Sequence, residues 1–147
     1  MLNARKASIV GKGLMMFAAG LSAVVLTASP AAAAVDDGFK ASIGGGCGVA
    51  EFVDYGPGSP SNPANNDDYI VVHDYCADGM TILAYAYLNN VYYGSKANNN
   101  GAAGAPVYWD PWGNVLKGDK MELSVCLLTD GYVWGCSSDV ARVSADG

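Results

Sequence analysis

The sequence holds a single histidine, His73, the side chain best suited to act as a general base near neutral pH. It stands beside Asp74 in a segment rich in valine and tyrosine. Adjacent residues of a strand point to opposite faces, so Asp74 is badly placed to orient His73 as a hydrolase triad requires. No G-x-S-x-G nucleophile motif accompanies the pair. We interpret His73 as a partly exposed strand residue and keep a small hydrolase using His73 or carboxylates as an alternative.

The 14 acidic residues offer a second kind of chemistry, because a pair of carboxylates at the right separation hydrolyses glycosides. Asp78, Asp119 and Asp130 each stand next to a glycine, where a short acidic side chain caps a turn. Residues 65–68 (NNDD) bring together oxygen ligands that suit calcium, but they do not follow the EF-hand spacing. We predict turn and surface roles for these residues, with no metal site and no cofactor.

The four cysteines, Cys47, Cys76, Cys126 and Cys136, predict two disulfides. None belongs to the close C-x-x-C pair that a structural zinc site uses. A turn at 129–131 would place positions 126 and 136 opposite each other on a hairpin, close enough for a bridge. We therefore predict Cys126–Cys136 and, by elimination, Cys47–Cys76. Oxidised cysteines do not serve as nucleophiles.

Aromatic side chains are the most suggestive sign of a binding function. Three tyrosines share one face of a predicted hairpin, and two tryptophans flank Pro111. Exposed flat rings stack on sugars or on protein surfaces, whereas the alternative is that they fill or cover the core. A proline between the tryptophans breaks the strand, so we expect at least one of them to be exposed. The candidate ligand contacts are Tyr85, Tyr87, Tyr92, Trp109 and Trp112.

Short β-strands must position these side chains. Residues 36–47, rich in glycine, predict a flexible lead-in, and the polar segments 56–68 and 97–106 predict surface loops. Pro111 confines its segment to the edge of a sheet. Alternating apolar residues between turn signals predict strands in residues 48–55, 69–76, 80–88, 91–95, 107–116, 120–128, 132–137 and 140–144.

This pattern predicts an all-β fold, because glycine, proline and asparagine interrupt every helical period after residue 34. We expect an antiparallel two-sheet sandwich, Ig-like, or a small barrel, with about six to eight short strands and two disulfides.

Residues 1–34 predict a cleaved signal peptide. Basic residues at the start precede an uncharged, mostly apolar run at 14–27, and small residues follow at 31–34. The run is shorter than the about 20 residues that cross a membrane. We expect cleavage after Ala34, with no membrane span in the mature protein, and a single secreted β domain in residues 35–147.

The mature chain would be strongly acidic. Removing residues 1–34 leaves 147 − 34 = 113 residues, with 14 acidic and 8 − 3 = 5 basic side chains, so its net charge is 5 − 14 = −9. Such a charge disfavours nucleic acid and anionic lipid surfaces as partners. It leaves an extracellular glycan or a protein as the expected partner.

Three segments resemble small secreted proteins of actinobacteria that have no assigned activity. The segments are DYCADG (74–79), GSKANNNGAAGAPVYWDPWGN (94–114) and GDKMELSVCL (118–127). The resemblance covers most of the mature chain. It implies an exported protein and names no function.

We interpret the chain as a secreted, non-catalytic binding domain that recognises an extracellular glycan or a component of the cell envelope. One alternative is a secreted toxin or inhibitor whose loops contact a protein target. The others are the small hydrolase and, more weakly, a carrier of a small ligand. The sequence does not set the oligomeric state.

Overall fold

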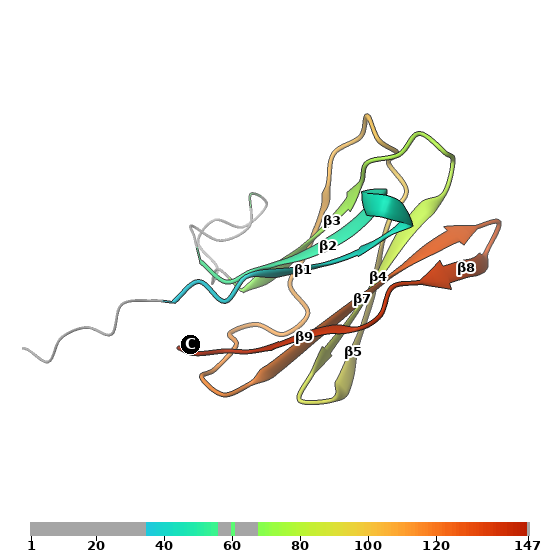
Figure 1. Cartoon of the computed structure of the whole chain (residues 1–147). Coiled ribbons are helices and arrows are strands. Elements are labelled where there is room, and N and C mark those ends of the chain that lie inside the picture. Colours follow the sequence, from blue (N-terminus) through green and yellow to red (C-terminus); the bar gives the residue numbers. More distant parts are fainter. Residues whose placement is uncertain (1–34, 56–59, 61–67, 147) are drawn as a thin grey trace, which may run out of the picture. The chain divides into compact units, whose positions relative to one another are not determined.

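The computed structural model describes residues 35–55, 60 and 68–146, and these residues form nine strands and one 3-10 turn (Figure 1). The predicted signal peptide, and the predicted loop at 56–68 apart from residues 60 and 68, lie outside the described residues. The elements are β1 Phe39–Ile43, η1 Gly44–Gly46, β2 Gly48–Val53, β3 Tyr69–Asp74, β4 Thr81–Leu88, β5 Val91–Asn98, β6 Val107–Trp109, β7 Lys120–Thr129, β8 Tyr132–Cys136 and β9 Val140–Val143.

The strands form two antiparallel sheets, which confirms the predicted all-β sandwich. The first sheet has the order β1-β2-β3-β6 and the second the order β5-β4-β7-β8, with β9 also paired to β7. Strand β7 pairs with β4 along most of its length. On its other side it pairs first with β9 and then with β8, so β8 and β9 share one edge of the sheet (Figure 1).

The core lies between the sheets because every second side chain of the long strands points inward. Strand β4 alternates strictly between partly buried and buried residues, and β2 does the same. The Phe52 ring packs against two other aromatic rings in this core. Its centroid lies 5.8 Å from that of Phe39 and 5.5 Å from that of Trp112. The largest fully buried side chains are those of Phe52, Ile70, Ile82, Met121, Leu123, Val72, Val115 and Val125.

The prediction that residues 36–47 form a flexible lead-in is wrong. Phe39 and Ala41 of β1 are buried, whereas Lys40 and Ser42, which follow them in alternation, are exposed. The whole strand pairs with β2, from Phe39 opposite Phe52 to Ile43 opposite Gly48. The alternation covers only five residues before the glycines begin, so it is too short to stand out in the sequence. This strand brings the count in the described residues to nine, one more than the largest number predicted.

Two other strands differ in extent from the prediction by more than two residues. Strand β5 continues to Asn98, whose buried amide donates a hydrogen bond to the Val72 carbonyl oxygen at 2.8 Å. Strand β6 covers only Val107–Trp109, because the chain turns at Pro111. It lies at the edge of the first sheet, as the proline predicts.

Both predicted disulfides are confirmed. Cys126 and Cys136 are direct partners across the β7–β8 ladder. Cys47–Cys76 joins the start of β2 to the segment after β3, where the Tyr75 N–H also donates to the Cys47 carbonyl oxygen at 2.8 Å. Disulfides of this kind are typical of oxidising compartments. No helix in the described ranges has the length and hydropathy needed to cross a membrane.

The two disulfides should stabilise the protein unequally. Their cysteines are 29 and 10 residues apart, and closing the longer loop removes more entropy from the unfolded chain. We predict a loss of about 3.5 kcal/mol of unfolding free energy for Cys47→Ala/Cys76→Ala, and of about 2.7 kcal/mol for Cys126→Ala/Cys136→Ala. Urea unfolding of each double variant checks this. The reverse order would show that native contacts around the bridges outweigh loop entropy.

Candidate functional site

The three predicted tyrosine contacts form a cluster on the outer face of the second sheet. Tyr87 and Tyr92 are partners across the β4–β5 ladder, and their ring centroids lie 5.4 Å apart. The Tyr85 ring lies 6.4 Å from that of Tyr92. Tyr92 is 54% exposed, whereas Tyr85 and Tyr87 are half-buried. The predicted common face is therefore confirmed, and one of the three rings is open to a ligand.

The two predicted tryptophan contacts pack against the core. Trp109 points inward from β6 and lies against Gly94 of β5, where an added Cβ would stand 3.4 Å from the indole. Trp112 packs against Phe52. We expected at least one exposed ring here, but both are half-buried, because they cover the end of the core beside the short strand β6. Their role as ligand contacts stays a prediction.

The most exposed aromatic side chains lie on β8 and were not among the predicted contacts. Tyr132 is 75% exposed and Trp134 is 71% exposed. All five residues of β8 are exposed, so the opposite sheet does not cover this strand. The type of turn that leads into it needs positive φ at both central residues, and Asp130 (47°) and Gly131 (81°) supply it.

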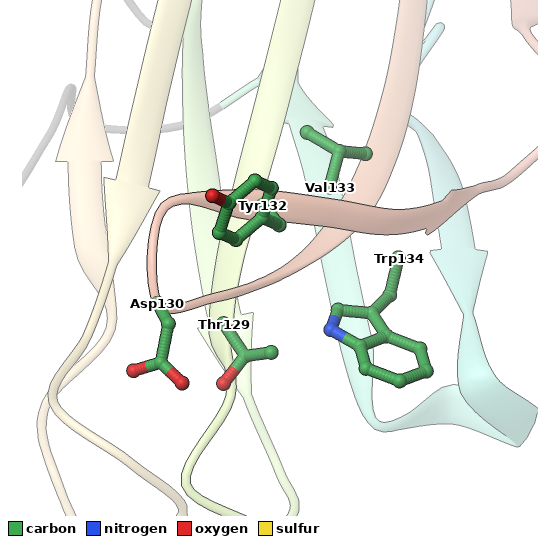
Figure 2. Close-up of a pocket in the computed structure, with 5 residues that line it drawn as sticks. All are labelled: Thr129, Asp130, Tyr132, Val133 and Trp134. Carbon is green, nitrogen blue, oxygen red and sulfur yellow. The ribbon is translucent and has the colours of Figure 1, made fainter.

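The β8 platform, as we name it, comprises the five residues that line a shallow pocket of about 450 Å³. Figure 2 shows Thr129, Asp130 and Trp134 projecting to one side of the hairpin, with Val133 on the other. The volume falls within the range of about 300–1,000 Å³ of small-molecule sites. The lining residues are Thr129, Asp130, Tyr132, Val133 and Trp134.

One feature of the sequence could have pointed to the platform. Tyr132, Val133 and Trp134 are three consecutive large apolar residues, whereas a strand with one covered face alternates apolar and polar side chains. The ladder adds a reason for this exposure. Leu127 pairs with Gly135 and Leu128 with Val133, so Trp134 is left without a ladder partner as the extra residue of a bulge on β8. A bulge re-aims side chains at a sheet edge.

His73 lies on the outer face of the first sheet, as predicted, and its neighbours come from two other strands. Its Nε2 is 3.7 Å from Glu51 Oε2, and Lys40 Nζ is 3.0 Å from the other Glu51 oxygen. The imidazole stacks on the Tyr75 ring at 5.1 Å. Burial lowers the pKa of His73, and the Lys40 charge adds to this, although Glu51 acts in the opposite direction.

Asp74 is turned away from His73, which agrees with the strand geometry used to argue against a triad. Its side chain is buried, and Oδ1 accepts a hydrogen bond from the Cys76 N–H at 3.2 Å. The carboxylate beside His73 is that of Glu51, which already pairs with Lys40. Lys40, Glu51 and His73 therefore form a row across three strands, in which Lys40 and Glu51 make an ion pair and His73 carries a charge only when it is protonated.

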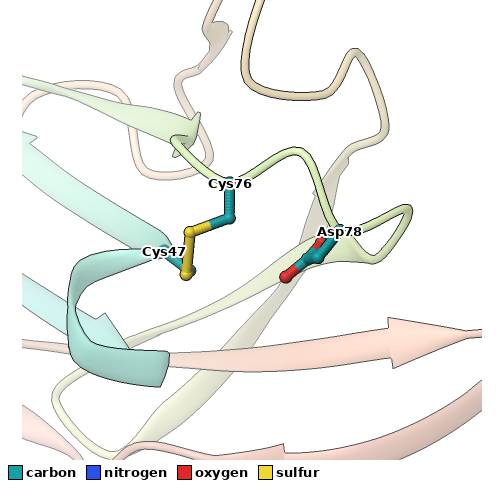
Figure 3. A group of neighbouring side chains, drawn as sticks. All are labelled: Cys47, Cys76 and Asp78. Carbon is teal, nitrogen blue, oxygen red and sulfur yellow. A yellow bond between two sulfur atoms is a disulfide. The ribbon is translucent and has the colours of Figure 1, made fainter.

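Two groups of metal-ligand residues come together in the described part of the chain. Figure 3 shows Cys47, Cys76 and Asp78, where both sulfur atoms belong to the disulfide and so cannot bind a metal as thiolates. The second group is Asp37, Asp54 and Asp146, whose carboxylate oxygens lie within 4.8 Å of one another. We name the second group the carboxylate cluster.

Each carboxylate of the cluster accepts a hydrogen bond from a backbone N–H group. The Asp37 N–H donates to Asp54 Oδ2 at 2.8 Å, and the Ala145 N–H donates to Asp37 Oδ2. The Val35 N–H donates to Asp146 Oδ2. The sequence could not indicate this group, because its members are brought together from both ends of the domain.

Comparison with models of protein families, with curated proteins and with solved structures finds no match to this chain.

The tryptophans should differ in what they contribute to stability. We predict that Trp109→Ala and Trp112→Ala each lower the unfolding free energy by about 2–3 kcal/mol, below the cost of a fully buried ring because both are half-buried. Trp134→Ala should change it by less than about 0.5 kcal/mol. Urea unfolding followed by near-ultraviolet dichroism measures all three. Equal losses would contradict the assignment of Trp134 to the surface.

Proposed function

We propose that the protein is a secreted, non-catalytic binding domain that recognises an extracellular glycan through the β8 platform. The observation that carries the proposal is the exposure of Tyr132 and Trp134, two positions apart on an uncovered edge strand. Secretion is supported by the signal-like residues 1–34 and by the two disulfides.

The exposure of these rings itself favours a partner. A tryptophan or tyrosine buries about 150–250 Å² of surface when it packs in a protein. The exposed rings of β8 leave most of this stabilising free energy of burial unused in the isolated domain. Grouped exposed apolar side chains mark interaction sites on soluble proteins. Tryptophan and tyrosine also contribute most often to the energetic centre of an interface. Trp134 is therefore the side chain from which we expect the largest share of binding energy.

The polar groups beside the rings favour a sugar. A pyranose presents a flat face of C–H groups to an aromatic ring and a rim of hydroxyl groups around it. The Thr129 hydroxyl and the Asp130 carboxylate line the same pocket and can bond such hydroxyls. Hydrogen bonds to a carboxylate are the stronger kind.

The negative charge of the platform and of the surrounding chain disfavours anionic glycans. Of its five lining residues, Asp130 is the one that carries a charge, and the mature chain around them has a net charge of −9. Sulfated, phosphorylated or uronic polymers would be repelled. We therefore propose a neutral or amino-bearing sugar polymer, such as chitin, cellulose or the glycan strands of peptidoglycan.

Replacing Trp134 should abolish most of the binding without harming the fold. We predict that the exported wild-type protein co-sediments saturably with at least one of insoluble chitin, cellulose and peptidoglycan. Trp134→Ala should weaken that binding at least about tenfold, which corresponds to about 1.4 kcal/mol. Tyr55→Ala is the matched control, because Tyr55 is 64% exposed but lies after β2 in the other sheet.

Three outcomes would count against the proposal. Absence of binding to all three polymers would favour a protein target instead of a glycan. An equal loss in Tyr55→Ala would indicate non-specific adsorption. A loss in Tyr92→Ala with none in Trp134→Ala would place the site on the tyrosine cluster at the other end of the sheet.

A further inference from the structure

The carboxylate cluster gathers three negative charges where the two ends of the domain meet. Asp37 lies just before β1, Asp54 just after β2, and Asp146 follows β9. Asp37 is only 6% exposed, and the other two are half-buried. Strands β1 and β9 belong to different sheets, so the cluster spans the two layers of the sandwich.

This arrangement carries an electrostatic cost. Burial raises the pKa of Asp54, and the charges of Asp146, Asp37 and Asp36 raise it further, although the hydrogen bond from the Asp37 N–H opposes them. Every charge acting on Asp54 is thus a carboxylate. Each of the ion pairs found in the described residues involves Lys40, His73 or Lys120, and none reaches the cluster.

The backbone nitrogen of Val35 already lies at this cluster, where it donates to Asp146 Oδ2. Val35 is also the first residue after the predicted cleavage position. In the uncleaved chain this nitrogen is a neutral amide. Hydrolysis of the Ala34–Val35 peptide bond adds one water, leaving the carboxyl group on Ala34 and an amine on Val35. That amine takes up a proton near neutral pH, because an α-amino group has a pKa of about 7.7–8.0.

We propose that Asp146, supported by Asp37 and Asp54, is an internal binding site for the α-ammonium group of Val35 that signal-peptide cleavage creates. The proposal is independent of glycan binding and rests on the predicted cut after Ala34. Cleavage supplies the positive charge that the cluster lacks. The ion pair then closes the sandwich where β1 of one sheet meets β9 of the other.

A second hydrogen bond joins the same two segments without involving Val35. The Ala145 N–H donates to Asp37 Oδ2, so the segment after β9 is bonded to the segment before β1 independently of Val35. The cluster is therefore assembled by the fold, and the new ammonium group enters an existing site. We infer that the exported chain reaches its full stability only after the leader has been removed.

The ion pair sets the direction of the pH dependence. Nearby carboxylates favour the charged amine, so the folded-state pKa of the α-amino group lies above its value in the unfolded chain. The contribution to stability is then complete below the unfolded pKa and is lost as the pH rises through the folded pKa. The Val35 nitrogen contacts Asp146 directly, and the other charged groups of this region, which act together with Asp146 on Asp54, are the carboxylates of Asp36 and Asp37.

The test uses the full chain, expressed with its leader and purified from the culture medium. Intact mass should give Val35 as the first residue. The α-amine is then methylated with a ¹³C label, which preserves its charge, and its pKa is measured by NMR. We expect a pKa about one unit or more above the ordinary range. Asp146→Asn should remove at least half of that shift, whereas Asp139→Asn, the same charge change at an exposed position, should leave it intact.

Stability provides a second readout. The Asp146→Asn variant should have a lower urea midpoint than wild type at pH 6, and the deficit should vanish or reverse by about pH 10. The Asp139→Asn variant should show no such crossover. The proposal is overturned by a first residue other than Val35, by an α-amino pKa in the ordinary range in the wild-type protein, or by equal effects of the two variants. The wild-type pKa decides the matter even if Asp146→Asn fails to fold.

Discussion

The fold depends on the burial of one face of β7. Met121, Leu123 and Val125 are completely buried between the sheets, and this strand pairs with β4 on one side and with both β8 and β9 on the other. A register slip of one residue would turn all three side chains towards water and move the Cys126 and Cys136 pair out of alignment. The same register of β7 therefore buries its core side chains and aligns the Cys126–Cys136 disulfide. The positions of β4, β8 and β9 follow from their pairing with β7.

This constraint also produces the exposed surface. The strands of the first sheet cover the inner face of the second sheet, but β8 continues past them as an edge strand with every residue exposed. Its backbone geometry is held firmly by the Cys126–Cys136 bridge and by the β7 ladder. Tyr132 and Trp134 are thus presented on a strand that a disulfide joins to its neighbour, and preorganisation of this kind lowers the entropic cost of binding. A stable edge strand with uncovered rings suits recognition better than catalysis.

The sequence predicts the sandwich well because its main signals are local. These signals belong to two hairpins: β4–β5, which turns at Asn89-Asn90, and β7–β8, which turns at Asp130-Gly131 and holds Cys126 and Cys136 opposite each other. The site is harder to predict because exposure depends on which strands face each other. The sequence predicts Trp109 as a ligand contact, but its ring lies against Gly94. It gives no such sign for Trp134, whose side chain is exposed. The contact between Val35 and Asp146 joins positions 111 residues apart, beyond the reach of any local pattern.

We propose that Trp134, alone among the three tryptophans, contacts a sugar. Each tryptophan indole N–H gives its own signal in a ¹H–¹⁵N correlation spectrum, so titration of labelled protein with soluble chitin, cellulose or peptidoglycan fragments distinguishes them directly. The Trp134 signal should shift saturably while those of Trp109 and Trp112, which pack on the core, stay in place. A saturable shift of the Trp109 or Trp112 signal with Trp134 unmoved would contradict the assignment of the β8 platform as the binding site.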